Sequence, residues 1–211
     1  MTRQIAGFEL RLPESWVAVP TDAPASVPEW ATSTAAALVA DVGTSGGHDL
    51  PVEELAGGLA RQLEDVARAV ADTGMPGLVT GALVRRPELG VVDAMVTVTA
   101  QPDLASDEFA AQLAEAVESS DEHDYAFAGQ VDGAVEAGDV TGLHAMITHF
   151  GEFGEEGTGM LEERVVLGVF PADSRDMVEV TAVARSVGTF DDMPQEMLDL
   201  LAGLSVETEA V

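Results

Sequence analysis

One short segment has the residue spacing of a serine nucleophile. Residues 43–47 read Gly-Thr-Ser-Gly-Gly, which matches the Gly-x-Ser-x-Gly elbow with Ser45 at its centre. In that elbow a helix starts directly from the serine, whereas four further residues, including Pro51, follow the motif here. A catalytic triad in this motif also needs an acidic residue after the serine and a histidine after that acid. Every acidic residue beyond His149 fails this order, because His149 is the last histidine. We therefore expect Ser45 to be a turn residue, with serine hydrolysis as an alternative.

Histidines and acidic clusters are the candidates for holding a metal ion. His144 and His149 lie five residues apart on one expected strand, so they should point to opposite faces and cannot bind the same ion. Asp121, Glu122 and Asp124 lie together and supply the oxygen ligands that hard cations prefer. Their spacing is not that of an EF-hand loop, so we expect a solvated loop and no metal site.

Other chemistry finds no support in the sequence. The chain has no cysteine, which excludes disulfides, thiol catalysis and thiolate metal sites. No glycine-rich segment has the residue order of a phosphate-binding loop or of a dinucleotide fingerprint. We therefore expect no cofactor and no enzymatic activity.

A long hairpin is the element around which we expect the fold to be organised. Residues 160–170 and 177–186 are rich in β-branched and apolar residues, and a turn that contains proline, aspartate and serine separates them. Apolar residues fill most positions of both runs, which is typical of strands covered on both faces. The pattern predicts that this hairpin lies at the centre of a sheet.

Helices are predicted where apolar residues recur every three or four positions. Leu55, Leu59 and Leu63 mark the clearest one, and Gly74 ends it. The apolar run 35–42, which glycines stop, instead predicts a short buried strand after a loop rich in proline. The expected strands are 8–12, 35–42, 78–85, 91–99, 131–137, 140–150, 160–170 and 177–186, and the expected helices are 52–73, 106–117 and 193–203.

Charge limits the partners that the protein can have. The sequence contains 38 acidic and 9 basic residues, all nine of them arginine, and its net charge is -29. Such a surface repels nucleic acids and anionic membranes. The charge is best explained by solubility, and a basic surface on a protein partner or cation binding is the functional alternative. The first residues contain no apolar segment of the kind found in signal peptides. The sequence also contains no apolar run long enough to span a membrane, so we expect a cytoplasmic location.

Both ends of the chain resemble the PsbP-like superfamily. Residues 8–16, Phe-Glu-Leu-Arg-Leu-Pro-Glu-Ser-Trp, are similar to its start, in which a strand is followed by proline, two residues and tryptophan. The long hairpin, a helix from Met193 and a short strand near Val206 are similar to its end. The superfamily includes the Mog-type Ran-binding proteins and the LpqN-like proteins of actinobacteria. The resemblance implies an α/β/α sandwich and mostly non-catalytic roles, and no set of functional residues carries over.

These patterns together predict one α+β domain over residues 1–211. The expected architecture is a three-layer α/β/α sandwich with a largely antiparallel sheet built from hairpins. We expect a non-enzymatic protein-binding or adaptor module that acts on a protein partner. The alternatives are a carrier of a small ligand or lipid, with a pocket between sheet and helix, and a small serine hydrolase that uses Ser45.

Overall fold

The computed structural model describes residues 3–21, 26–40, 42, 51–118, 124–150 and 159–210. The chain divides into two compact units, a larger one of residues 1–11 and 96–211 and a smaller one of residues 12–95. Their boundary falls inside strand β4. The expectation that residues 1–211 form a single domain stays a prediction.

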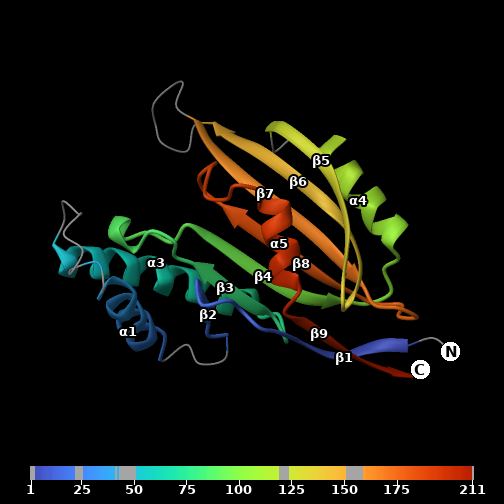
Figure 1. The fold of residues 1–211 in the computed structure, drawn as a ribbon, viewed down its shortest axis with the longest axis horizontal. Coiled ribbons are helices and arrows are strands. Elements are labelled where there is room, and N and C mark those ends of the chain that lie inside the picture. The colour runs from blue at the N-terminus through green and yellow to red at the C-terminus, as the bar shows by residue number, and fades with distance from the viewer. Residues whose placement is uncertain are drawn as a thin grey trace. The chain divides into compact units, whose positions relative to one another are not determined.

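The larger unit is built on a sheet in which strands follow the order β4-β8-β7-β6-β5 (Figure 1). Neighbours from β5 to β8 pair antiparallel. The expected hairpin is confirmed as β7 and β8, and β7 lies in the middle of these five strands. The elements are β4 (Ala94–Gln101), α4 (Ser106–Glu118), β5 (Asp124–Val135), β6 (Gly138–Phe150), β7 (Gly159–Phe170), β8 (Met177–Ala184) and α5 (Met193–Leu201).

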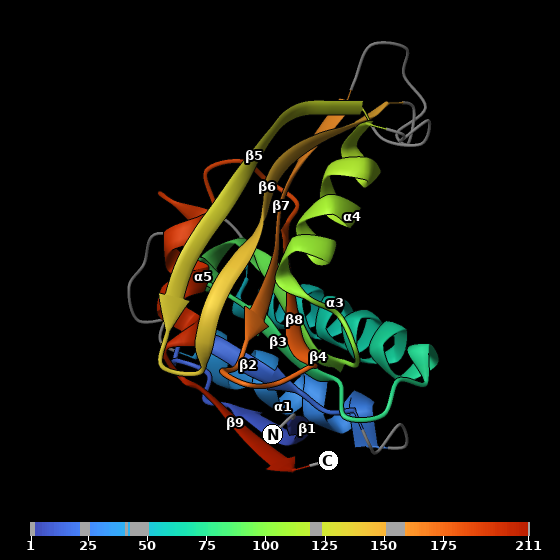
Figure 2. The same ribbon diagram turned by 90° about the vertical axis from the view of Figure 1, so that its right-hand side faces the viewer.

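Helices α4 and α5 cover opposite faces of this sheet (Figure 2). Phe109 of α4 lies over Gly168 of β7, where an added Cβ would stand 2.9 Å from the phenylalanine ring. Leu198 of α5 lies over Gly133 of β5, where an added Cβ would stand 3.2 Å from the leucine methyl groups. The two glycines pair with adjacent residues of β6, and adjacent strand residues face opposite sides. The larger unit is therefore a three-layer α/β/α arrangement.

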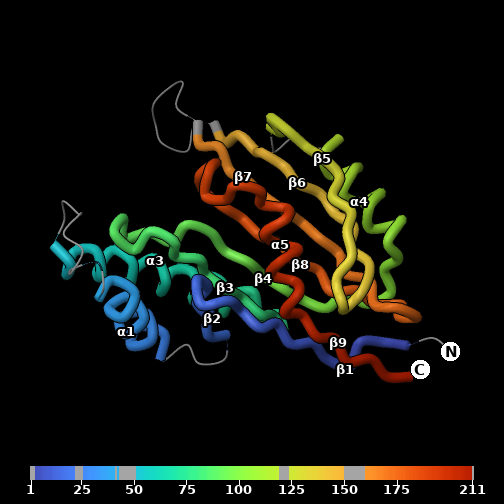
Figure 3. The backbone as a smooth tube through the Cα atoms, viewed as in Figure 1, coloured from blue at the N-terminus to red at the C-terminus, as the bar shows by residue number. Residues whose placement is uncertain are grey.

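The two ends of the chain pair with each other in the larger unit. Strand β1 (Arg3–Leu10) runs antiparallel to β9 (Leu204–Ala210), so the N- and C-terminal segments lie side by side (Figure 3). Asp176, at the end of the β7–β8 turn, accepts a hydrogen bond from the backbone N–H of Ile5 at 2.7 Å. This contact ties the two-stranded ribbon to the central hairpin.

The smaller unit buries the expected amphipathic helix. Helix α3 presents Leu55, Leu59 and Leu63 to its core, all at most 2% exposed, as their spacing predicts. The helix ends at Gly74, whose φ of 61° is the left-handed conformation that favours glycine. The elements are β2 (Trp16–Val19), α1 (Val27–Val39), α3 (Val52–Thr73), β3 (Val79–Leu83) and the 3-10 turn η2 (Pro87–Leu89).

The predicted buried strand at 35–42 is wrong. Residues 35–39 belong to α1, which packs on α3 and starts one residue before Pro28. Proline fits the first turn of a helix, so it marks the start of α1 and not a loop. The buried residues recur every four positions, as Val27, Ala31, Ala35 and Val39.

One buried carboxylate fixes the connection between β3 and β4. The side chain of Asp93 is fully buried and accepts hydrogen bonds from the backbone N–H groups of Arg85 and Arg86 at 2.8 and 3.2 Å. The guanidinium of Arg86 donates two more, at 3.0 and 2.6 Å. The carboxylate thus satisfies backbone donors that the turn leaves unpaired.

The α+β fold class is confirmed. Four α-helices and antiparallel strand pairs make up the described part of the chain. Asp192 caps α5 by accepting a hydrogen bond from the backbone N–H of Gln195 at 3.1 Å. The expected strands 131–137 and 140–150 leave residues 138–139 as the turn, whereas the turn between β5 and β6 uses residues 136–137, because Val135 already pairs with Gly138.

Candidate functional site

Half of the residues singled out for chemistry lie outside the described residues. This is so for Ser45, and also for Asp121 and Glu122. Asp124 is the first residue of β5 and is exposed. Within the residues that the structure describes, no three acidic or histidine side chains converge as metal ligands would.

Strand β5 is an edge strand of the larger unit. It is 12 residues long and stands last in the strand order, with β6 as its neighbour. Its pairing register slips between Tyr125 and Phe127, so Ala126 is an extra residue in a bulge. Without a bulge, residues two apart would share a face. The bulge instead puts Tyr125 and Phe127 on opposite faces.

Phe127 lies half exposed on the face that α5 covers. Its side chain is 46% exposed, which is high for a phenylalanine. The ring lies over Gly129, where an added Cβ would stand 2.8 Å from it. It also meets the ring of His144 edge-on, with centroids 5.4 Å apart and planes at 67°. These contacts hold the ring in place, although nearly half of the residue's surface stays exposed to solvent.

His144 is held by a buried glutamate on the neighbouring strand. Its Nε2 lies 2.9 Å from Oε1 of Glu163. The two share a face, because His144 pairs with Val165 and Glu163 precedes that residue by two positions. The side chain of Glu163 is 6% exposed, and its Oε2 is buried without a hydrogen-bond partner in the described part of the chain.

A groove of about 300 Å³ runs between β5 and the start of α5. We call it the Phe127 groove. His144 and Phe127 line its sheet side, and Asp192, Pro194 and Leu198 line its helix side. Asp192 supplies the acidic side chain of the lining, because the carboxylate of Asp132 accepts hydrogen bonds from Gln130 and Thr141 on the opposite face of the sheet. Arginine supplies none of the lining. The full lining consists of Phe127, Gly129, Gln130, Val131, Asp132, His144, Asp192, Pro194, Gln195 and Leu198.

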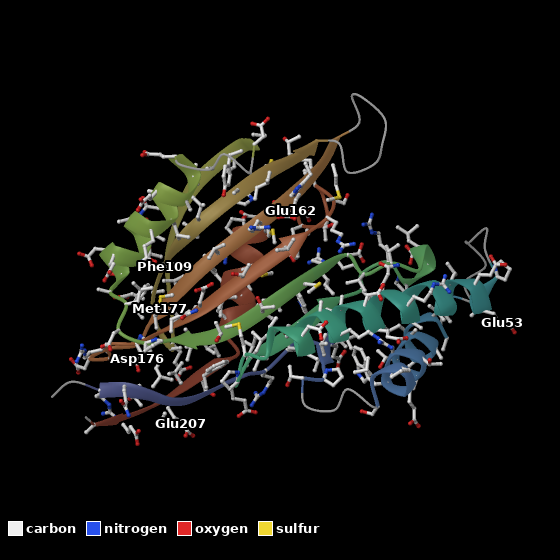
Figure 4. The ribbon with its side chains drawn as sticks, turned by 180° about the vertical axis from the view of Figure 1, so that it is seen from behind. Glu53, Phe109, Glu162, Asp176, Met177 and Glu207 are labelled. Carbon is white, nitrogen blue, oxygen red and sulfur yellow. The ribbon has the colours of Figure 1, made fainter. Side chains whose placement is uncertain are left out.

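A second polar cluster lies on the other face of the sheet. Glu162, which Figure 4 labels, accepts hydrogen bonds from Arg164 at 2.9 and 2.6 Å, and its other oxygen lies 3.4 Å from Nε2 of His149. His144 and His149 therefore face opposite sides, as their spacing predicts. Both oxygens of Glu162 have partners, which makes this cluster a structural one.

The sequence did not single out Phe127 or Glu163, although one signal was present. Glu162 and Glu163 are consecutive acids inside a run that is otherwise mostly apolar. Consecutive strand residues face opposite sides, so a strand covered on both faces must bury one acid on each. Phe127 had no such signal, because a bulge decides which way it points.

Neither protein-family models nor curated proteins identify a family for the chain. No family model matches it, and no curated protein gives a significant match. Among the described helices, none combines the length and apolar content needed to cross a bilayer. The proposed function therefore rests on the geometry of the chain itself.

Proposed function

We propose that this protein is a non-enzymatic module that binds a protein partner at the Phe127 groove and the adjoining edge of β5. The observation that carries the proposal is Phe127, a held but half-exposed aromatic ring on the last strand of the sheet. Aromatic side chains beside a pocket commonly dominate the affinity of a protein interface. A ring held by Gly129 and His144 also loses little conformational entropy on binding.

The backbone of β5 supports the same surface. An edge strand presents unpaired N–H and C=O groups, which an extended segment of a partner can join as an additional strand. The bulge at Ala126 interrupts regular pairing at one end of β5. Bulges of this kind also protect an edge against uncontrolled pairing.

Charge supports a protein partner over a nucleic acid or an anionic membrane. The net charge of -29 opposes binding to phosphate groups.

We also propose that the protein is cytoplasmic and that it is a member of the PsbP-like superfamily. A three-layer unit whose last helix is capped by Asp192 and followed by a strand supports that membership.

A carrier of a small ligand is the second candidate. A groove of about 430 Å³ in the larger unit is lined by Glu9, Arg11, Glu136 and residues 202–206. Its volume is in the range of ligand sites, but its lining is more polar than those sites usually are. The hydrolase alternative has no supporting observation in the described residues, because Ser45 lies outside them.

The proposal is tested by affinity capture with a matched pair of variants. Phe127→Ser removes the ring from the proposed surface. Leu89→Ser removes an equally exposed side chain, 50% against 46%, from the smaller unit. We expect a protein retained stoichiometrically by the wild type to be lost with Phe127→Ser and kept with Leu89→Ser. Equal retention by both variants would mean that the partner binds elsewhere, and a chain that retains no protein would contradict the proposal.

A further inference from the structure

We propose that the segment bound at β5 is extended and basic, and that it places an arginine side chain in the Phe127 groove. This inference rests on the proposed function and adds the chemistry of the partner. Three observations on the same face of the sheet lead to it: the half-exposed ring of Phe127, the half-paired carboxylate of Glu163, and the charge of the groove.

The strand edge sets the conformation of the partner. A segment that adds to β5 must be extended, and alternate side chains along it then point to the face that α5 covers. That face carries Phe127, Gly129 and Val131 on β5 itself, since residues two apart share a face beyond the bulge. One side chain of the added strand therefore comes beside Phe127 and reaches into the groove.

The groove selects a positive charge at that position. The carboxylate of Asp192 lies at the groove, and none of the nine arginines of the chain lines it. Glu163 lies directly behind His144, buried on the same face of the sheet. A carboxylate in surroundings of low dielectric constant, such as Glu163, adds a negative potential to that of the exposed Asp192. The chain as a whole, with a net charge of -29, adds to this attraction over longer distances.

Arginine fits the groove better than lysine does. Its guanidinium is planar, so it stacks on an aromatic face such as that of Phe127. It also carries five N–H donors, which suit a site where Oε2 of Glu163 has no partner among the described residues. His144 stands between the ring and the carboxylate, with Nε2 directed to Glu163.

The test uses two synthetic octapeptides of alternating valine and threonine with one central position changed. One peptide has arginine there, and the other has citrulline, which keeps the shape but carries no charge. Each is titrated to millimolar concentration into the full chain at about 0.15 M salt, and the backbone N–H signals are followed by NMR. We expect the arginine peptide to shift signals of β5 and to bind about tenfold more tightly than the citrulline peptide, as one partly desolvated cation–π contact and a charge pair predict.

Two variants locate the binding. Phe127→Leu keeps an apolar side chain without the ring, and Glu163→Gln keeps the shape without the charge. We expect each to reduce the preference for arginine at least threefold, while Leu89→Ser leaves it unchanged. A preference that survives both substitutions would reflect general attraction to an acidic protein and would overturn the inference.

The remaining outcomes separate this inference from the proposed function. If the two peptides bind equally and both need Phe127, the docking surface stands and the arginine assignment is wrong. If neither peptide shifts β5, or if the signals instead report pairing of β5 with a second copy of the chain, the inference is wrong as well. The capture experiment with Phe127→Ser decides the proposed function independently in all of these cases.

Discussion

Replacing Glu163 by glutamine tests whether its buried oxygen, which has no partner among the described residues, lowers the stability of the folded protein. Burying an oxygen without a partner costs about 1–3 kcal/mol, and the cost is larger for a charged group than for a neutral one. Glu163→Gln keeps an oxygen for His144 and puts a neutral amide where Oε2 now lies without a partner. We therefore expect the free energy of unfolding at neutral pH to rise by about 1 kcal/mol. For a protein of this size that is an increase in Tm of about 2–4 °C.

Glu162→Gln is the matched control, because both oxygens of Glu162 have partners. That change removes charge from its contacts with Arg164 and His149 and should lower the free energy of unfolding by about 1–3 kcal/mol. Urea denaturation followed by circular dichroism measures both variants. If Glu163→Gln destabilised the protein as much as Glu162→Gln does, Oε2 would have a stabilising partner in the protein and could not be held ready for a ligand.

The other predictions concern the packing and charge of the chain. Trp16→Ala should cost about 3–5 kcal/mol, because Trp16 is only 9% exposed; an unchanged denaturation midpoint would contradict its place in the core. Asp93→Ala should cost a similar amount, about 3–5 kcal/mol, since it leaves two backbone N–H groups and Arg86 without their acceptor; a loss below about 1 kcal/mol in the same assay would mean that water replaces the carboxylate. Adding about 0.1 M salt should raise Tm by screening the self-repulsion that a net charge of -29 creates; calorimetry that shows a lower Tm would indicate that attractive ion pairs dominate.

Hydrophobic spacing predicted the elements whose burial is regular. Helix α3 follows from leucines four residues apart, and the β7–β8 hairpin follows from apolar residues at most positions of two runs. Met177 of β8 and Met193 and Met197 of α5 also lie in the core, and all three are at most 1% exposed. In these elements local propensity and tertiary packing agree, so the sequence alone is sufficient.

The wrong predictions arise where a short sequence pattern is compatible with two different structures. Proline before an alanine-rich run suggested a loop and then a strand, but proline also opens helices, and α1 results. The expected strands 131–137 and 140–150 leave Gly138 in the turn between them, whereas it starts β6 and pairs with Val135. Glycine is required there because an added Cβ would stand 2.2 Å from the carbonyl oxygen of Phe170. That requirement depends on a neighbouring strand, so it cannot be inferred from the residues next to Gly138 in the sequence.

The candidate site was beyond prediction for a related reason. A bulge at Ala126 decides which face Phe127 occupies, and a bulge depends on the pairing of two strands and not on the residues of one. The pairing of His144 with Glu163 depends on the register between β6 and β7. Registers follow from the packing of the whole sheet, so neither contact could be read from the spacing of residues along the chain.

Photo-crosslinking from position 127 tests the central claim most directly. A benzophenone amino acid in place of Phe127 keeps an aromatic group at the proposed surface and reacts only with what touches it. The same amino acid in place of Leu89 is the control on the smaller unit. Irradiation in a native lysate should give a discrete crosslinked protein from position 127 and none from position 89. Absence of any crosslink from position 127, or the same diffuse products from both positions, would contradict the account.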